Sequence, residues 1–123
     1  MKIGMTGNRD GITKEAIITF ENFLKKSKID EAHHGDCVGA DKMFHDVLHN
    51  KKIKIIIHPP NDNKLRSFCK SEFILPSKPY LDRNKDIVND TNILIAFPSS
   101  EIELLRSGTW STIRYARKIK KKY

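Results

Sequence analysis

Three short segments of the sequence carry residue types that suit phosphate and sugar groups. The first, Ser107-Gly108-Thr109, opens a predicted helix, so its free amides and the helix dipole favour an anion. Gly108 lets a phosphate approach the backbone closely, and the two hydroxyls add hydrogen-bonding groups. An ordinary N-cap that binds no ligand is the alternative interpretation of these three residues.

The second segment, Gly7-Asn8-Arg9, follows the predicted first strand. Gly7 allows a tight turn and Asn8 tolerates unusual backbone angles. Arg9 can hold a phosphate through two parallel hydrogen bonds. A surface turn with a solvated arginine is the alternative here.

The third segment, residues 35–41 (GDCVGAD), places two glycines and two carboxylates at the start of a helix. Asp36 and Asp41 are candidates to accept a ribose hydroxyl or to act as a catalytic base, with Gly35 and Gly39 shaping the turn. Either aspartate could equally be a helix-start acid that the helix dipole stabilises.

Further candidates follow the long segment in the middle of the chain. Arg83 and Asn84 lie near the start of a predicted helix, from which they can reach the same cleft, and Pro98 follows the last strand. His45 and His49 have a spacing that can bind metal, but the segment reads HDVLH and offers no third ligand. We therefore expect neither a metal nor a cofactor.

Strands and helices alternate along the chain, which predicts the framework that positions these groups. The segment between Pro59 and Pro79 holds four prolines and is much longer than an ordinary connection, so we expect a short extra helix in it. The expected strands are Lys2–Thr6, Ile29–His34, Ile53–His58 and Asn92–Phe97. The expected helices begin near Thr13, Ala40, Asn63, Tyr80 and Ser107.

This alternation predicts a single α/β domain over residues 1–123, a Rossmann-like three-layer sandwich with a mostly parallel four-stranded sheet of order 3-2-1-4. Ligands of such sheets bind beyond the carboxyl ends of the strands, where the strand order reverses. That point lies between the first and fourth strands, where the three segments meet. The fourth strand becomes an edge that a homodimer or a larger homo-oligomer could cover.

Net charge, apolar content and cysteine content indicate what kind of protein this is. The chain has 123 residues and a net charge of +8, and six cations, without any acid, fall in its last ten residues. We interpret this basic tail as a solvated helix end, with a nucleic-acid arm as the alternative. No segment is long and apolar enough to cross a membrane, and no signal peptide is evident, so we expect a cytoplasmic protein with two reduced cysteines.

The segments MKIGMTGNRD, HGDCVGAD, PYLDRNKDIV, LIAFP and SGTWSTIRYARK together resemble the SLOG superfamily. That superfamily includes the Lonely Guy enzymes, DprA and YpsA-like Rossmannoid domains. The resemblance implies a nucleotide pocket, often in a homo-oligomer. Relative to the PGGxGTxxE motif of Lonely Guy enzymes, Gly108 and Thr109 match the GT and Arg83 matches an arginine on a preceding helix. Leu105 and Arg106 replace the paired glycines, and Thr112 replaces the glutamate.

The sequence is compatible with three functions. The first is binding of a small phosphate-bearing nucleotide (nucleoside monophosphate, cyclic or ADP-ribose type) by a sensor or sequestering protein. The second is N-glycosidic cleavage of nucleoside 5′-phosphates, in which Arg83 holds the sugar-phosphate and Asp36 or Asp41 replaces the missing glutamate. The third is an accessory protein that binds single-stranded nucleic acid through its basic tail.

Overall fold

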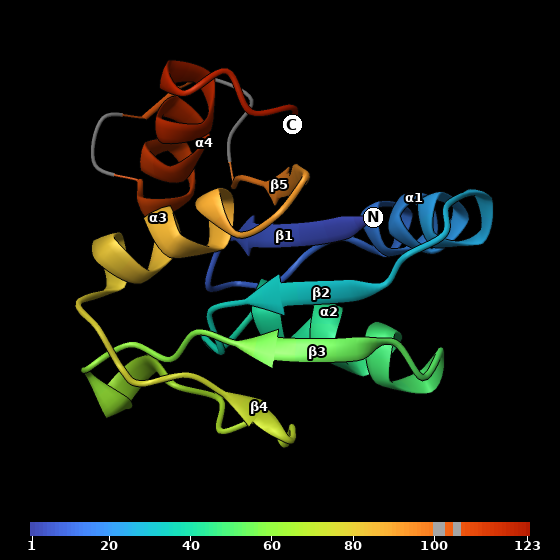
Figure 1. Cartoon of the computed structure of the whole chain (residues 1–123), viewed down its shortest axis with the longest axis horizontal. Helices are drawn as coiled ribbons and strands as arrows, with labels where there is room; N and C mark the ends of the chain where they lie inside the picture. Colours follow the sequence, from blue (N-terminus) through green and yellow to red (C-terminus); the bar gives the residue numbers. More distant parts are fainter. Residues whose placement is uncertain (100–102, 105–106) are drawn as a thin grey trace.

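The computed structural model has an α/β architecture with three layers (Figure 1), and it describes residues 1–99, 103–104 and 107–123. Helices α1 (Lys14–Lys26) and α2 (Ala40–Asn50) cover one face of the sheet. Helices α3 (Tyr80–Asn89) and α4 (Gly108–Lys118) lie on the opposite face. No described helix is long and apolar enough to cross a membrane.

The sheet has five parallel strands in the order β4-β3-β2-β1-β5. The predicted order of the four expected strands is confirmed, because β1 lies between β2 and β5. The strand count is corrected from four to five, because the long segment returns beside β3 and pairs with it over two residues. The strands are β1 (Lys2–Gly7), β2 (Glu31–His34), β3 (Lys54–Ile57), β4 (Phe73–Ile74) and β5 (Ile93–Phe97).

The short helix expected at residues 63–69 is only one 3-10 turn, η1 (Asn63–Leu65). Asp62 caps this turn by accepting from the Lys64 amide at 2.9 Å. Arg66 then leaves the helical conformation and reaches the buried carboxylate of Asp36. A tertiary contact therefore ends the helix that local sequence favours.

The apolar core fixes β1 from both sides. Thr13 caps α1 by accepting from the Ala16 amide, and the helix then buries Phe20 against Phe44 of α2, with ring centroids 5.2 Å apart. On the opposite face, Ile87 of α3 packs directly on Gly4. The smaller cluster on that side consists of Val88, Leu94 and Ala116.

The outer side of β5 is partly covered by the chain's own C-terminus. The Leu94 amide donates to the Lys122 carbonyl at 2.9 Å, and Lys122 forms a parallel bridge with Ile93. The sequence predicts this strand as an edge, and the bridge from the C-terminus was not predicted. The remainder of this edge has no strand partner among the described residues.

Candidate functional site

A cavity of about 680 Å³ opens at the carboxyl ends of β1 and β5, where the strand order reverses. Its walls come from the β1–α1 loop, the start of α2, the long segment, the start of α3 and the start of α4. Nine of the thirteen predicted ligand-binding residues line it: Gly7, Asn8, Arg9, Asp41, Arg83, Asn84, Ser107, Gly108 and Thr109. Gly35, Asp36, Gly39 and Pro98 do not.

The start of α4 presents the predicted phosphate-binding segment to this cavity. Ser107 is the N-cap of α4, and its hydroxyl accepts from the Trp110 amide at 3.2 Å. Gly108 lies next to Tyr80, since a Cβ at position 108 would stand 3.5 Å from the Tyr80 ring. The capped first turn thus faces the cavity with little side-chain bulk, which suits an anion.

The turn after β1 is held in place by Asn8. Its side-chain amide donates to the Phe97 carbonyl at 3.2 Å, and its Oδ1 accepts from the Asp10 amide at 2.9 Å. The Asn8 carbonyl accepts from the first amide of α2, that of Ala40, at 3.0 Å. Asn8 therefore joins the ends of β1 and β5 to α2, and its neighbour Arg9 is exposed at the cavity.

Gly39 explains how α2 comes so close to this turn. It has φ +88°, and a Cβ on it would stand 2.2 Å from the Arg9 carbonyl oxygen. Only glycine satisfies both conditions at low cost. Gly39 therefore shapes the cavity from behind rather than lining it.

Asp41 places a buried carboxyl group in the wall of the cavity. Its side chain is 7% exposed, and Oδ2 accepts from the Cys37 amide at 3.2 Å. Oδ1 has no hydrogen-bond partner among the described residues. Burial raises the pKa of Asp41 from 3.8 to about 6, although the Arg83 guanidinium opposes the shift. Oδ1 is therefore a buried acceptor that the described residues leave unpaired.

Asp36 is instead fully engaged by the protein. Its carboxylate pairs with Nε of Arg66 at 2.8 Å and accepts from the Cys69 amide at 2.9 Å. Its backbone has φ +56°, and the residue is wholly buried. Both contacts come from the long segment, so Asp36 fastens that segment beside the cavity.

Arg83 connects the carboxyl ends of β2 and β3 to α3. Its Nε donates to the Tyr80 carbonyl at 3.1 Å, Nη1 donates to the carbonyls of Gly35 and His58, and Nη2 donates to Sγ of Cys37 at 3.0 Å. Four of its five N–H groups thus serve described parts of the protein. A ligand in the cavity would find the remaining N–H on Nη2.

Sequence reasoning missed the apolar part of the wall. Tyr80 and Leu104 line the cavity and are 48% and 43% exposed. Cys37 also lines it, and burial raises the pKa of this thiol, so it is neutral at pH 7. An aromatic residue directly after Pro79, at the start of a helix that faces the cleft, was the available signal for Tyr80.

The basic tail is partly engaged with the protein itself. Arg117 lies 3.4 Å from Oε1 of Glu103, and Lys121 donates to the Thr91 carbonyl at 2.6 Å. Leu105 and Arg106, which replace the paired glycines of the Lonely Guy motif, lie outside the described residues.

The chain matches no protein-family model and no curated protein. Among solved structures it is similar to the X-ray structure of TM1055, a structural-genomics target. The TM-score is 0.72 at 11% identity, over 98% of this chain and 70% of the other. At this identity the similarity shows the α/β fold alone.

Proposed function

We propose that the cavity binds a small phosphate-bearing nucleotide, as a sensor or a sequestering protein. The observation that carries the proposal is the combination, in one cavity of about 680 Å³, of a capped helix N-terminus and a buried carboxyl oxygen without a partner. A nucleotide offers an anion and sugar hydroxyls, which complement these two groups. The resemblance to the SLOG superfamily supports the same ligand class.

The phosphate end of the ligand is assigned to the start of α4 and to Arg9. Gly108 and Thr109 supply the first amides of the helix, where the dipole favours negative charge, and Ser107 is the N-cap that precedes them. No carboxylate in residues 1–99, 103–104 and 107–123 pairs with Arg9, so its guanidinium is available for a phosphate.

The sugar and the base are assigned to the remaining walls. A ribose hydroxyl that reaches the buried Oδ1 of Asp41 would give this oxygen the partner it lacks. Tyr80 and Leu104 provide the exposed apolar surface on which a base can stack. The ribose and the base are thus each placed against the part of the wall whose polar or apolar groups complement them.

Equilibrium dialysis against a mixed nucleotide pool, with both chambers analysed by liquid chromatography and mass spectrometry, tests the proposal. We expect one intact nucleotide to be enriched on the protein side and its enrichment to fall in Arg9→Gln and Asp41→Asn. Asp46→Asn is the matched control, because Asp46 lies on the same helix and pairs with Lys42 at the surface. A pool that stays equal across the membrane would overturn the proposal.

The second candidate is an N-glycosidase. It is favoured by the buried carboxyl group of Asp41, whose Oδ1 has no partner among the described residues. The hydroxyl of Thr112, which replaces the motif glutamate, donates to the Gly108 carbonyl at 2.9 Å and is buried. Asp36 is engaged by Arg66, so Asp41 is the available carboxyl group. Water would add across the N-glycosidic bond, giving free base and ribose 5-phosphate, with the Asp41 carboxylate stabilising the developing positive charge. Detection of both products with wild type, and of neither with Asp41→Asn, would establish this activity.

The predicted homodimer or larger homo-oligomer belongs to the same proposal. β5 is an edge strand that its own C-terminus covers only near Ile93 and Leu94. Light scattering coupled to size-exclusion chromatography would show a mass of twice 14.2 kDa or more if this edge joins two copies. A mass of 14.2 kDa would contradict it.

A further inference from the structure

Two buried histidines and an aspartate meet on the side of the sheet that faces α3. His33 lies on β2 beside Gly4, whose position contacts Ile87 of α3. His58 directly follows β3, and Asp90 is the C-cap of α3. Nδ1 of His33 lies 2.7 Å from Nε2 of His58, and a carboxylate oxygen of Asp90 lies within 4.8 Å of both rings' ligand atoms. We propose that these three side chains bind a divalent transition-metal ion, Zn²⁺ in the first instance.

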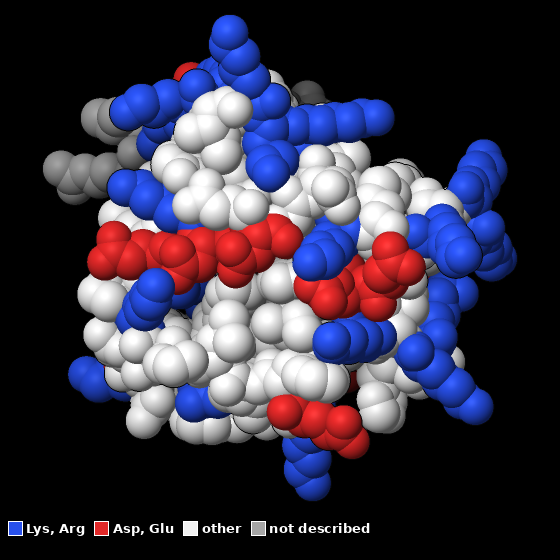
Figure 2. All heavy atoms as spheres, viewed as in Figure 1, with Lys and Arg blue, Asp and Glu red and all other residues white. Residues whose placement is uncertain are grey.

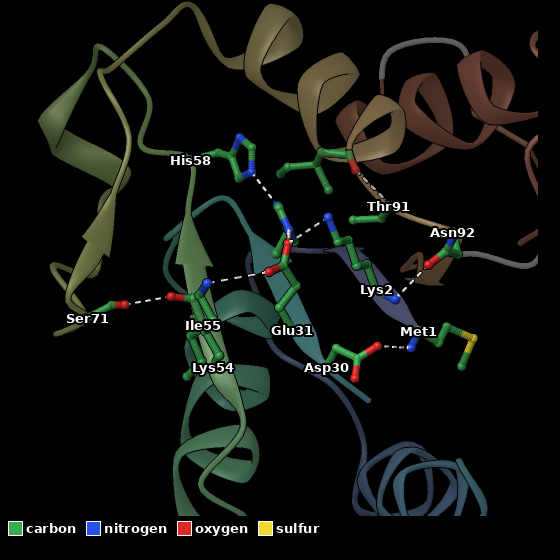
Figure 3. A network of polar contacts seen from close by, with 12 residues as sticks. Met1, Lys2, Asp30, Glu31, Lys54, Ile55, His58, Ser71, Thr91 and Asn92 are labelled. Atoms are coloured by element: carbon green, nitrogen blue, oxygen red, sulfur yellow. Dashed lines mark hydrogen bonds and ion pairs between the residues drawn. The ribbon is translucent and has the colours of Figure 1, made fainter. Parts of the chain in front are cut away.

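Glu31 determines which ring nitrogen of His33 carries the proton. Nε2 of His33 lies 2.9 Å from Oε1 of Glu31, and the same carboxylate contacts Lys2 and Lys54 (Figure 3). Because a carboxylate accepts hydrogen bonds, we assign the proton of a neutral His33 to Nε2 and a lone pair to Nδ1. The 2.7 Å contact is then a hydrogen bond that Nε2–H of His58 donates to Nδ1 of His33 in the metal-free protein. A metal ion bound by both nitrogens takes the place of this proton, and His58 carries its proton on Nδ1 instead. Histidines that bind zinc commonly donate their second N–H to a carboxylate in this manner.

Space for further ligands lies directly beside the three donors. A second cavity, of about 400 Å³, is lined by His58 and Asp90 together with Leu75, Pro76, Lys78 and Asp86. Two histidines and one carboxylate leave a fourth zinc position open, which water from this cavity can occupy. Arg83 lines both cavities and donates to the His58 carbonyl at 3.0 Å. Metal binding at His33, His58 and Asp90 requires no nucleotide in the larger cavity.

Carboxylates of α3 and its C-cap offset the charges of Lys78 and Arg83, which line the same cavity. α3 and its C-cap carry Asp82, Asp86 and Asp90 at intervals of four residues. Figure 2 shows a band of acidic side chains across the middle of this face, where Figure 1 places α3, on a protein whose net charge is +8. Asp86 is held by Lys78 at 2.6 Å, whereas Asp90 offers a carboxylate oxygen within 4.8 Å of the ligand atoms of His33 and His58.

A second group of donors, His34, His45 and Cys69, serves as an internal contrast. The Asp36 amide donates to Nδ1 of His34 at 2.9 Å, so the proton of this neutral ring must be on Nε2. That N–H in turn donates to Nδ1 of His45 at 2.9 Å. A metal on Nε2 of His34 would have to remove this proton and leave an imidazolate. His58 can move its proton to Nδ1 when a metal takes Nε2, whereas His34 cannot, because its Nδ1 accepts from the Asp36 amide. The hydrogen bonds therefore oppose metal binding more strongly here than at His33 and His58.

Titration of the chelator-treated full chain with Zn²⁺, followed by isothermal calorimetry, tests the proposal. We expect one equivalent to bind and the melting temperature to rise with Zn²⁺. Asp90→Asn should weaken the affinity at least about tenfold, because it removes the charged donor of the proposed ligand set. Asp82→Asn, on the exposed start of the same helix, is the matched control and should bind as wild type does.

The visible absorption spectrum of the Co²⁺-bound protein tests independently which atoms bind the metal. Co²⁺ should show visible d–d bands without a thiolate-to-metal charge-transfer band, because the proposed donors are nitrogen and oxygen. His58→Gln should remove these bands; if that buried substitution prevents folding, the exposed Asp90→Asn decides. Absence of stoichiometric binding, equal affinity in wild type and Asp90→Asn, or a thiolate band that Cys69→Ser abolishes would each overturn the proposal.

Discussion

The backbone amide of Cys37 donates to Oδ2 of Asp41 at 3.2 Å and leaves Oδ1, on the same buried carboxyl group, without a described partner. Cys37 lies in the turn that precedes α2, and Asp41 lies in the first turn of that helix. The turn therefore orients the carboxyl group without neutralising it. Burial of this carboxyl group affects the unfolding free energy of the protein even when no ligand is bound.

Asp41 should make the protein less stable as the pH rises. Its pKa is about 6 when folded, against 3.8 when exposed, because burial disfavours the charged form. Below about pH 4 the carboxyl group is protonated in both states, and above about pH 6 folding must bury a charge. Asp41→Asn should therefore gain about 3 kcal/mol of unfolding free energy relative to wild type between pH 4 and pH 8. Urea unfolding of both proteins across this range measures the gain.

The matched control is an exposed acid on the same helix. Asp46→Asn loses only a surface ion pair with Lys42 and should change the unfolding free energy by less than about 1 kcal/mol. A difference between Asp41→Asn and wild type that stays constant from pH 4 to pH 8 would mean that burial does not raise the pKa of Asp41.

Ser107 should contribute both to the stability of α4 and to ligand binding. Ser107→Ala removes the oxygen that accepts from the Trp110 amide, which should cost about 1 kcal/mol. Thr13→Ala removes the equivalent cap of α1, which does not line the cavity, at a similar cost. Only Ser107→Ala should also weaken the nucleotide enriched in dialysis. Equal loss of binding in both variants would assign the effect to stability.

Gly35 should resist even the smallest substitution, because of Arg83. A Cβ at position 35 would stand 2.2 Å from Nη1 of Arg83, whose guanidinium is fixed by buried hydrogen bonds. Gly35→Ala should therefore displace the guanidinium and cost about 1–3 kcal/mol in thermal or denaturant unfolding. In Gly108→Ala the added Cβ meets only ordinary van der Waals contact, so the variant should be as stable as wild type or slightly more stable.

The parts of the fold that local pattern determines were predictable. Apolar periodicity and the alternation of strands with helices gave the three layers and the position of β1 between β2 and β5. The same reasoning placed nine candidate residues around one cavity, because the carboxyl ends of parallel strands meet at one edge. Ser107 and Thr13 act as helix caps, as their types predict.

What could not be predicted depends on contacts between distant segments. The two residues of β4 are too few to show a strand period, and their partner is β3 across a proline-rich segment. Asp36 and Asp41 look equivalent in the sequence, yet Arg66, 30 residues further along, engages only Asp36. The pairing of His33 with His58 likewise arises from strand register, which no local motif reports.

The contact between Asp36 and Arg66 should determine whether the long segment stays closed. Asp36→Asn places an amide where the carboxylate now accepts from Arg66 and from the Cys69 amide, leaving one buried donor unpaired. We expect a loss of about 2–4 kcal/mol and faster proteolysis within residues 59–79. Asp46→Asn, which breaks an exposed ion pair of similar length, should lose less than about 1 kcal/mol and keep the wild-type digestion rate. Cleavage of Asp36→Asn at the wild-type rate would show that other contacts hold the segment.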